Sequence, residues 1–204
     1  MSRRNFRILV AGVVGLLAFI WWQSVHYPIR NSKPSGSNII AFGDSLTYGF
    51  GAGPGEDYPS QLSTMIGTPV LNKGVNAETT ENALQRLDRD VLKSNPKIVI
   101  VLLGGNDLLN RLPLETTFRN LDTIVERVQD SGALVVLVGL RNILGDQYGA
   151  RYKELAKRRG AVFVPDIMRE IISSPKLKSD QVHPNGEGYK IIAERISQAL
   201  KPYL

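Results

Sequence analysis

The chain has no cysteine and only two histidines among its 204 residues. Disulfide bonds, thiolate metal ligands and cysteine nucleophiles are therefore excluded, and two histidines leave little material for a dedicated transition-metal site. The sequence also lacks a Walker A motif and a G-x-G-x-x-G fingerprint, which argues against nucleotide binding through a phosphate loop or a dinucleotide site. We accordingly expect no metal ion and no other cofactor.

Acidic residues are missing from the first 33 positions, although these hold five of the 25 basic residues. Without those five, 20 basic residues face 19 acidic ones, so the formal net charge falls from +6 to +1. A nucleic-acid-binding domain carries its basic excess on the folded body, where it contacts phosphates. The nearly neutral body therefore argues against nucleic acid as a partner and against a strongly anionic substrate.

Charged residues are also absent from Ile8 to Ile29, a stretch that opens with an unbroken apolar run ending at Trp22. Its 22 residues would form about 33 Å of helix, enough to cross a hydrocarbon core of about 30 Å. Aromatic residues at its far end and three arginines before it are typical of a membrane-spanning helix with a cytoplasmic amino terminus. No A-x-A-like cleavage site follows, so the sequence favours an uncleaved anchor over a secretory signal.

This pattern divides the chain into a membrane anchor (residues 1–30), a short exposed linker (31–37) and one globular domain (38–204). The domain has an ordinary size for a single hydrophobic core. The anchor would place it on the periplasmic or extracytoplasmic side of a membrane. Secretion after cleavage of a signal sequence is the alternative.

Short apolar runs alternate with longer amphipathic stretches throughout the domain. Runs that are apolar and β-branched at consecutive positions indicate buried parallel strands, and they cover Asn38–Phe42, Pro69–Leu71, Ile98–Leu103, Ala133–Leu140 and Ala161–Val164. Helical patterns cover Tyr58–Ile66, Thr79–Lys93, Leu114–Asp130, Tyr148–Arg159 and Asn185–Leu200. The alternation predicts an α/β fold with a three-layer, doubly wound, flavodoxin-like sheet of five parallel strands. Ligands of such sheets bind beyond the carboxyl ends of the strands.

Three residues near those strand ends and the last loop suit nucleophilic catalysis. His183 is the only histidine of the domain, so it is the sole candidate for a histidine base. Asp180 precedes it by three residues, which lets its carboxylate reach the imidazole and hold one tautomer. Ser45 follows a strand and precedes a glycine-rich loop, which exposes its hydroxyl as a nucleophile.

Acyl transfer also needs hydrogen-bond donors for the oxyanion. Asn106 can present its side-chain amide after the third strand, and the backbone N–H groups of Ser45 and Ala77 can join it. Each of these residues taken alone has an ordinary role in a turn or a helix cap. Their order and spacing together predict a Ser-His-Asp site with an oxyanion hole.

These motifs resemble the conserved blocks of the SGNH hydrolase superfamily, the GDSL-type esterases and lipases. Gly43–Leu46 resembles the first block, Gly104–Asp107 the third, and Asp180-x-x-His183 the fifth. Val70–Leu87 is most similar to the branch of bacterial lysophospholipase/acyl-CoA thioesterase I and arylesterases. The resemblance implies an SGNH hydrolase fold, the catalytic roles described above, and hydrolysis of esters and thioesters without a cofactor.

One position departs from the family pattern. The second block of the family supplies a glycine whose N–H completes the oxyanion hole, and alignment through the ETTENALQRL segment puts Ala77 there. Alanine still has an N–H, so the hole survives if the backbone angles at this position are open to alanine. Gly74, three residues earlier, is the second candidate for this donor.

The loops beside the predicted site are apolar, and Leu108, Leu109 and Ile143 are the candidate substrate-binding residues. Such a cleft suits an acyl chain, although the same side chains could simply pack beneath the loops. We expect a monomeric catalytic domain that hydrolyses a small-molecule acyl ester, such as a lysophospholipid, an aryl ester or an acyl thioester. The alternatives are a carbohydrate O-acetylesterase of cell-envelope glycans and a catalytically silent, membrane-anchored binding module.

Overall fold

The computed structural model describes residues 27–140 and 146–204. The expected anchor lies almost entirely in residues 1–26, outside the described residues, and so does Ile143. Within the described ranges, no helix combines the length and the apolar character that a membrane crossing requires.

Five parallel strands form one sheet in the order β2-β1-β3-β4-β5. The strands are β1 (Asn38–Gly43), β2 (Val70–Gly74), β3 (Pro96–Leu102), β4 (Leu134–Val138) and β5 (Val162–Val164). The predicted flavodoxin-like sheet is therefore confirmed. Chain order reverses between β1 and β3, and the carboxyl ends of strands at such a switch point border the ligand site.

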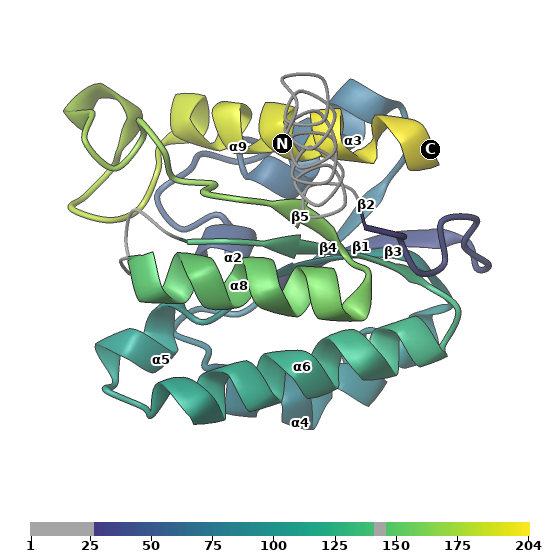
Figure 1. Cartoon of the computed structure of the whole chain (residues 1–204). Coiled ribbons are helices and arrows are strands. Elements are labelled where there is room, and N and C mark those ends of the chain that lie inside the picture. The colour runs from purple at the N-terminus through teal and green to yellow at the C-terminus, as the bar shows by residue number, and fades with distance from the viewer. Residues whose placement is uncertain (1–26, 141–145) are drawn as a thin grey trace, which may run out of the picture.

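Helices cover both faces of the sheet and complete the three layers (Figure 1). The helices α3 (Tyr58–Ile66) and α9 (Gly186–Leu200) pack on one face, and α4 (Thr80–Asp90), α6 (Leu114–Asp130) and α8 (Asp146–Arg159) on the other. These five agree closely with the predicted helices. One of them is shorter than predicted: α4 ends at Asp90, whereas the predicted helix ran from Thr79 to Lys93. A 3₁₀ turn, Leu92–Ser94, follows it.

Two short helices, α2 (Ser45–Tyr48) and α5 (Gly105–Leu109), directly follow the ends of β1 and β3. Neither was predicted, since four or five residues are too few to show a helical period. The chain also forms 3₁₀ turns at Pro175–Leu177 and Lys201–Tyr203. The two short helices carry residues of the predicted site, so they matter for its geometry.

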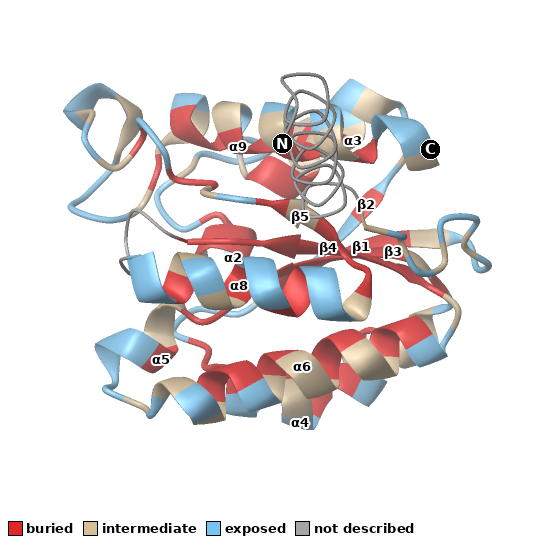
Figure 2. Ribbon diagram, viewed as in Figure 1, coloured by how far each residue is buried: buried red, intermediate tan, exposed pale blue. Residues whose placement is uncertain are grey.

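The central strands are buried from both sides, as Figure 2 shows. All five residues of β4 are buried, which accounts for its continuous apolar sequence. On α6, buried Leu121, Val125 and Val128 follow the three- and four-residue spacing of one helix face. By contrast, β2 lies at the sheet edge with Leu71 and Asn72 exposed. The carboxyl end of β2 therefore lacks the apolar pattern that indicates a buried strand. For this reason the predicted strand Pro69–Leu71 ends before β2 does.

Residues 27–37 run past the amino-terminal ends of the strands. Three hydrogen bonds join this segment to carbonyl groups that directly precede strands. Tyr27 Oη donates to the one before β5 at 2.8 Å, and Asn31 Nδ2 to the one before β4 at 2.9 Å. The N–H of Ser37 donates to the one before β3 at 3.1 Å. Much of the segment is exposed, as expected for 31–37, but these bonds hold it against the body. It lies at the end of the sheet opposite the carboxyl ends of the strands.

Candidate active site

Ser45 stands where β1 passes into α2. Asp44 caps this short helix, and its Oδ1 accepts the N–H of Leu46 at 3.0 Å. A Cβ atom at Gly43 would lie 2.4 Å from the carbonyl oxygen of Leu102, so only glycine lets β1 end this close to β3. Ser45 is the first residue of α2, a position whose N–H has no acceptor within a helix.

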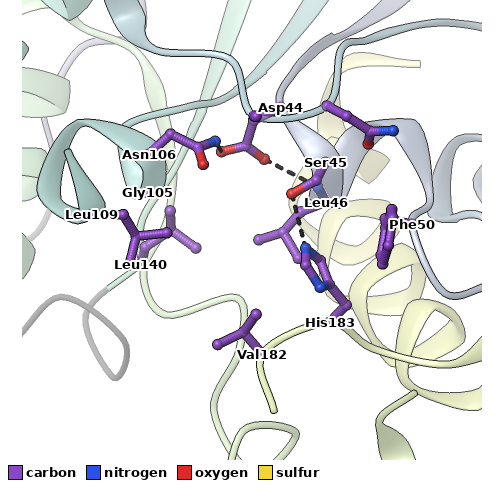
Figure 3. Close-up of a pocket in the computed structure, with 12 residues that line it drawn as sticks. Asp44, Ser45, Leu46, Phe50, Gly105, Asn106, Leu109, Leu140, Val182 and His183 are labelled. Carbon is purple, nitrogen blue, oxygen red and sulfur yellow. Dashed lines mark hydrogen bonds between the residues drawn. The ribbon is translucent and has the colours of Figure 1, made fainter. Parts of the chain in front are cut away.

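Ser45, His183 and Asp180 form a hydrogen-bonded chain (Figure 3 shows its first bond). Ser45 Oγ lies 3.1 Å from Nε2 of His183, and Nδ1 of the same ring lies 2.7 Å from Asp180 Oδ2. Asp180 Oδ1 accepts the backbone N–H groups of His183 and Val182 at 2.7 and 2.8 Å. These two bonds, together with the side-chain bond to His183, lower the pKa of Asp180 to about 2. The carboxylate is therefore ionised and can stabilise an imidazolium.

Backbone hydrogen bonds and an aromatic contact fix the loop that carries His183. The N–H of Ser179 donates to the carbonyl oxygen of His183 at 2.9 Å, next to an antiparallel bridge between Lys178 and Pro184. The ring of Phe50 packs against the imidazole with a centroid distance of 4.6 Å. These contacts hold the imidazole toward Ser45, and Phe50 is a site residue that sequence reasoning missed.

Ser45, Ala77 and Asn106, the residues of the predicted oxyanion donors, all border one pocket beside the nucleophile. Asn106 lies on α5, and its Nδ2 donates to the carbonyl oxygen of Glu78 at 3.0 Å, with Asp44 Oδ2 at 3.5 Å. Ala77 borders the same pocket, and its N–H has no hydrogen-bond partner among the described residues. Its φ of 57° lies in the left-handed region, which alanine enters at a cost of roughly 1–2 kcal/mol.

Gly74, the second candidate for the oxyanion donor, has different contacts. Its N–H donates to Asn72 Oδ1 at 2.9 Å, and it does not border the pocket. A Cβ atom at Gly74 would lie 2.0 Å from the backbone nitrogen of Tyr48. Glycine at this position therefore allows β2 to pack closely against α2.

An apolar pocket of about 260 Å³ opens beside Ser45 and His183. Its large apolar side chains are Leu46, Phe50, Leu109, Leu140 and Val182, and the methyl group of Ala77 also borders it. In Figure 3, Leu109, Leu140 and Val182 lie on one side of the Ser45–His183 pair and Phe50 on the other.

Of the predicted substrate-binding residues, Leu109 borders this pocket, Leu108 does not, and Ile143 lies outside the described residues. Leu140 and Val182 were not predicted to bind substrate. Leu140 was predicted as the last residue of the strand Ala133–Leu140, but β4 ends at Val138 and Leu140 lies beyond it.

Asp44 is a buried carboxylate beneath the nucleophile, with 2% of its surface exposed. Burial raises the pKa of Asp44 to about 7, and the nearby carboxylates of Glu78 and Asp107 add to the shift. Asp107 itself accepts the N–H and the hydroxyl of Thr80 at 2.9 and 2.5 Å. In the described part of the chain, no cluster of three or more histidine, cysteine or acidic residues could hold a metal ion.

Comparison with known proteins agrees with this geometry. The model of the GDSL-like lipase/acylhydrolase family matches residues 41–191. The chain is 28% identical to an arylesterase of Vibrio mimicus, covering 85% of this chain and 92% of that protein. It is 29% identical to thioesterase 1/protease 1/lysophospholipase L1 of Escherichia coli K12, covering 80% and 83%. The crystal structure of AlinE4, an SGNH-hydrolase family esterase, superposes with a TM-score of 0.64 at 35% identity, covering 81% and 96%. The chain therefore belongs to the GDSL-like lipase/acylhydrolase family and is a hydrolase that acts on esters.

Proposed function

We propose that this chain hydrolyses carboxylic esters or thioesters of apolar acyl groups through a Ser45–His183–Asp180 triad and a covalent acyl-enzyme. The observation that carries the proposal is the hydrogen-bonded chain from Ser45 Oγ to His183 Nε2 at 3.1 Å and from His183 Nδ1 to Asp180 Oδ2 at 2.7 Å. It stands at the mouth of an apolar pocket, where an acyl chain could lie while its carbonyl carbon meets Ser45.

In the first half of the reaction, Ser45 Oγ attacks the carbonyl carbon while Nε2 of His183 takes the hydroxyl proton. Asp180 holds Nδ1–H toward itself and stabilises the imidazolium that forms. The N–H groups of Ser45 and Ala77 and the amide of Asn106 receive the oxyanion, and each such donor is worth about 3–4 kcal/mol of the barrier. His183 then returns the proton to the departing alcohol or thiol.

In the second half, a water molecule attacks the acyl-enzyme and gives its proton to Nε2 of His183. The same donors receive the second oxyanion, and collapse of this intermediate releases the carboxylic acid and restores the hydroxyl of Ser45. Every proton passes through Nε2 of one imidazole, so one base serves both steps.

The pocket wall supports this choice of substrate class. Six apolar side chains border the pocket, which favours an aliphatic or aromatic acyl group over a sugar ring that needs hydrogen-bond partners. Lysophospholipids, aryl esters and acyl thioesters all present such a group. The arylesterase of V. mimicus and the thioesterase 1/protease 1/lysophospholipase L1 of E. coli agree by name with this range.

The test uses p-nitrophenyl esters from acetyl to palmitoyl with the full-length chain and its Ser45→Ala variant. We expect an optimum beyond acetyl in the wild type and a loss of several orders of magnitude in the variant. Activity confined to acetyl esters would instead favour the O-acetylesterase of envelope glycans. Equal inertness of both proteins on every p-nitrophenyl ester would instead support the silent binding module.

We also propose that the predicted 1–30 anchor holds the protein in a membrane through residues 1–26, with the catalytic domain on the extracytoplasmic side, because Tyr27 and Arg30 are bonded to the domain itself. The support is the charge-free stretch from Ile8 to Ile29 behind three arginines. The hydrogen bonds of residues 27–37 are at the amino-terminal ends of the strands, so an anchored domain would carry its site at the end of the sheet away from the tether. Carbonate-washed membranes should retain the chain, whereas recovery of a shortened soluble form would favour secretion after cleavage.

A further inference from the structure

Arg86 is a buried cation that borders no part of the substrate pocket. It lies on α4, and only 8% of its surface is exposed. Its guanidinium packs over the ring of Phe42 at 4.4 Å and pairs with Glu78 and with Asp90 at 2.9 Å. Although burial opposes the charge, the hydrogen bonds that Arg86 donates to Glu78 and Asp90 raise the pKa of Arg86 above its usual value.

The same guanidinium joins the carboxyl ends of β1 and β2 to the loop that follows β2. Its Nη2 donates to the carbonyl oxygen of Lys73 at 2.9 Å, near the end of β2, and to that of Gly43 at 3.3 Å, at the end of β1. Nε and Nη2 also bind both oxygens of Glu78, with Nε 2.6 Å from Oε1. Glu78 itself is only 4% exposed, so this ion pair is shielded from water.

Each oxyanion donor lies within a few bonds of these contacts. Ser45 is two residues beyond Gly43, and Ala77 is bonded directly to Glu78. The carbonyl oxygen of Glu78 accepts the Nδ2 of Asn106 at 3.0 Å. One side chain therefore holds the backbone on which all three donors depend, although it touches none of them itself.

We propose that Arg86 is a positioning residue of the oxyanion hole, which keeps Ser45, Ala77 and Asn106 at the spacing that the transition state requires. This inference rests on the proposed function, because it assigns Arg86 to the reaction of that same site. Donors act on an oxyanion only when they are held about 2.7–3.1 Å from it before it forms. Preorganisation of this kind depends on the residues that lock the donors in place.

The chemistry of arginine suits this position. Its planar fork reaches a carboxylate and neighbouring carbonyl oxygens at once, whereas a lysine ammonium is a single point that cannot span them. A buried ion pair is also a poor source of stability, because desolvation offsets much of the attraction. A positioning role explains why a fully paired cation is buried here.

The test compares Arg86→Met and Arg86→Lys with the wild type, using the p-nitrophenyl ester that the wild type hydrolyses fastest. Methionine keeps apolar packing over Phe42 but removes the charge and the donors, and lysine keeps the charge without the fork. We expect kcat to fall by about tenfold to a hundredfold in Arg86→Met, with KM changed less than about threefold, because the donors act on the transition state. Arg86→Lys should recover only part of this loss.

The matched control is Arg159→Met. Arg159 also binds two carboxylates, those of Asp122 and Glu126, but it lies on α8 outside the pocket. Its replacement should lower stability and leave kcat unchanged. All rates are measured at a temperature where circular dichroism shows each variant to be folded, and Arg86→Lys carries the test if Arg86→Met does not fold.

A double variant separates positioning from general damage. Asn106→Ala alone should lower kcat by about 10²–10³. Once that donor is gone its placement no longer matters, so Arg86→Met combined with Asn106→Ala should cost less than the product of the single losses. The proposal would be overturned if the loss of kcat in the double variant equalled the product of the two single losses. It would also be overturned if kcat were unchanged in Arg86→Met, or if kcat fell equally in Arg159→Met. If the wild type hydrolyses no ester at all, the proposed function fails first and this inference with it.

Discussion

Asp180 and His183 are joined by a turn that uses both oxygens of one carboxylate. Oδ2 faces Nδ1 of the imidazole at 2.7 Å, while Oδ1 accepts two backbone N–H groups of the same turn, one of them that of His183. The carboxylate thus orients the ring and shapes the loop that carries it. Nε2 is left to face Ser45, as a general base requires.

The first prediction concerns this carboxylate. In Asp180→Asn, the amide oxygen can still accept the backbone N–H groups, so the turn and the thermal midpoint should change little. The amide cannot hold Nδ1–H as the carboxylate does, so kcat should fall by about 10²–10⁴. Steady-state kinetics beside a thermal melt checks both parts. A wild-type rate in this variant would remove Asp180 from the triad.

The second prediction concerns the left-handed backbone of Ala77, whose φ is 57°. Glycine adopts this conformation without the steric cost of a Cβ atom, although it loses more entropy on folding. Ala77→Gly should therefore keep kcat within about threefold and raise the free energy of unfolding by up to about 1 kcal/mol. Urea denaturation and ester hydrolysis measure the two quantities. A hundredfold loss of kcat would mean that the donor geometry depends on the methyl group.

The third prediction follows from Asp44, whose pKa burial raises to about 7. The folded state binds this proton more tightly than the unfolded state, so its stabilising effect is complete below pH 4 and is lost as the pH rises through 7. Asp44→Asn removes this dependence and keeps an acceptor for the N–H of Leu46. Its stability advantage over the wild type should therefore grow between pH 5 and pH 8, as measured by urea denaturation.

Asp122 provides a control of opposite sign for that experiment. Hydrogen bonds from Arg159 lower the pKa of Asp122, so its contribution is present above the unfolded-state pKa and is lost as the pH falls. Asp122→Asn should thus be at its greatest disadvantage at neutral pH. Parallel pH profiles for the two variants would contradict the assignment of the raised pKa to Asp44.

The fourth prediction uses two adjacent leucines of α5. Leu109 borders the pocket, whereas Leu108 does not, although both side chains are exposed to solvent. Leu109→Ser should lower kcat/KM for octanoyl esters by about fivefold to tenfold and leave acetyl esters unchanged, because a hydroxymethyl group replaces apolar contact area. Leu108→Ser is the matched control and should leave both substrates unchanged. Equal effects of the two variants would place the acyl chain elsewhere.

Much of this architecture could be predicted from the sequence. Runs such as Ile98–Leu103 have no polar face, which is the signature of a strand covered on both sides. The rule that ligands bind beyond the carboxyl ends of strands then selected Ser45 and Asn106, and a single histidine in the domain left no choice of base. Local sequence was sufficient here because the signal lies in a few neighbouring residues.

Other parts depend on contacts between distant segments. Phe50 packs on His183 and Arg86 binds the carbonyl oxygen of Gly43, yet each pair is far apart in sequence and carries no shared motif. The choice between Ala77 and Gly74 likewise required the backbone angles and hydrogen bonds of a loop. Pairwise packing of this kind leaves little trace in the local pattern from which elements are predicted.

The most direct test of the account is the site of covalent reaction. The full-length chain is treated with a p-nitrophenyl phosphonate ester, which leaves a stable adduct on an activated serine, and the product is digested and analysed by mass spectrometry. The account predicts one adduct, on the peptide that contains Ser45, and its loss in Ser45→Ala. An adduct on another residue, or equal labelling of Ser45→Ala, would contradict the assignment of Ser45 as the nucleophile.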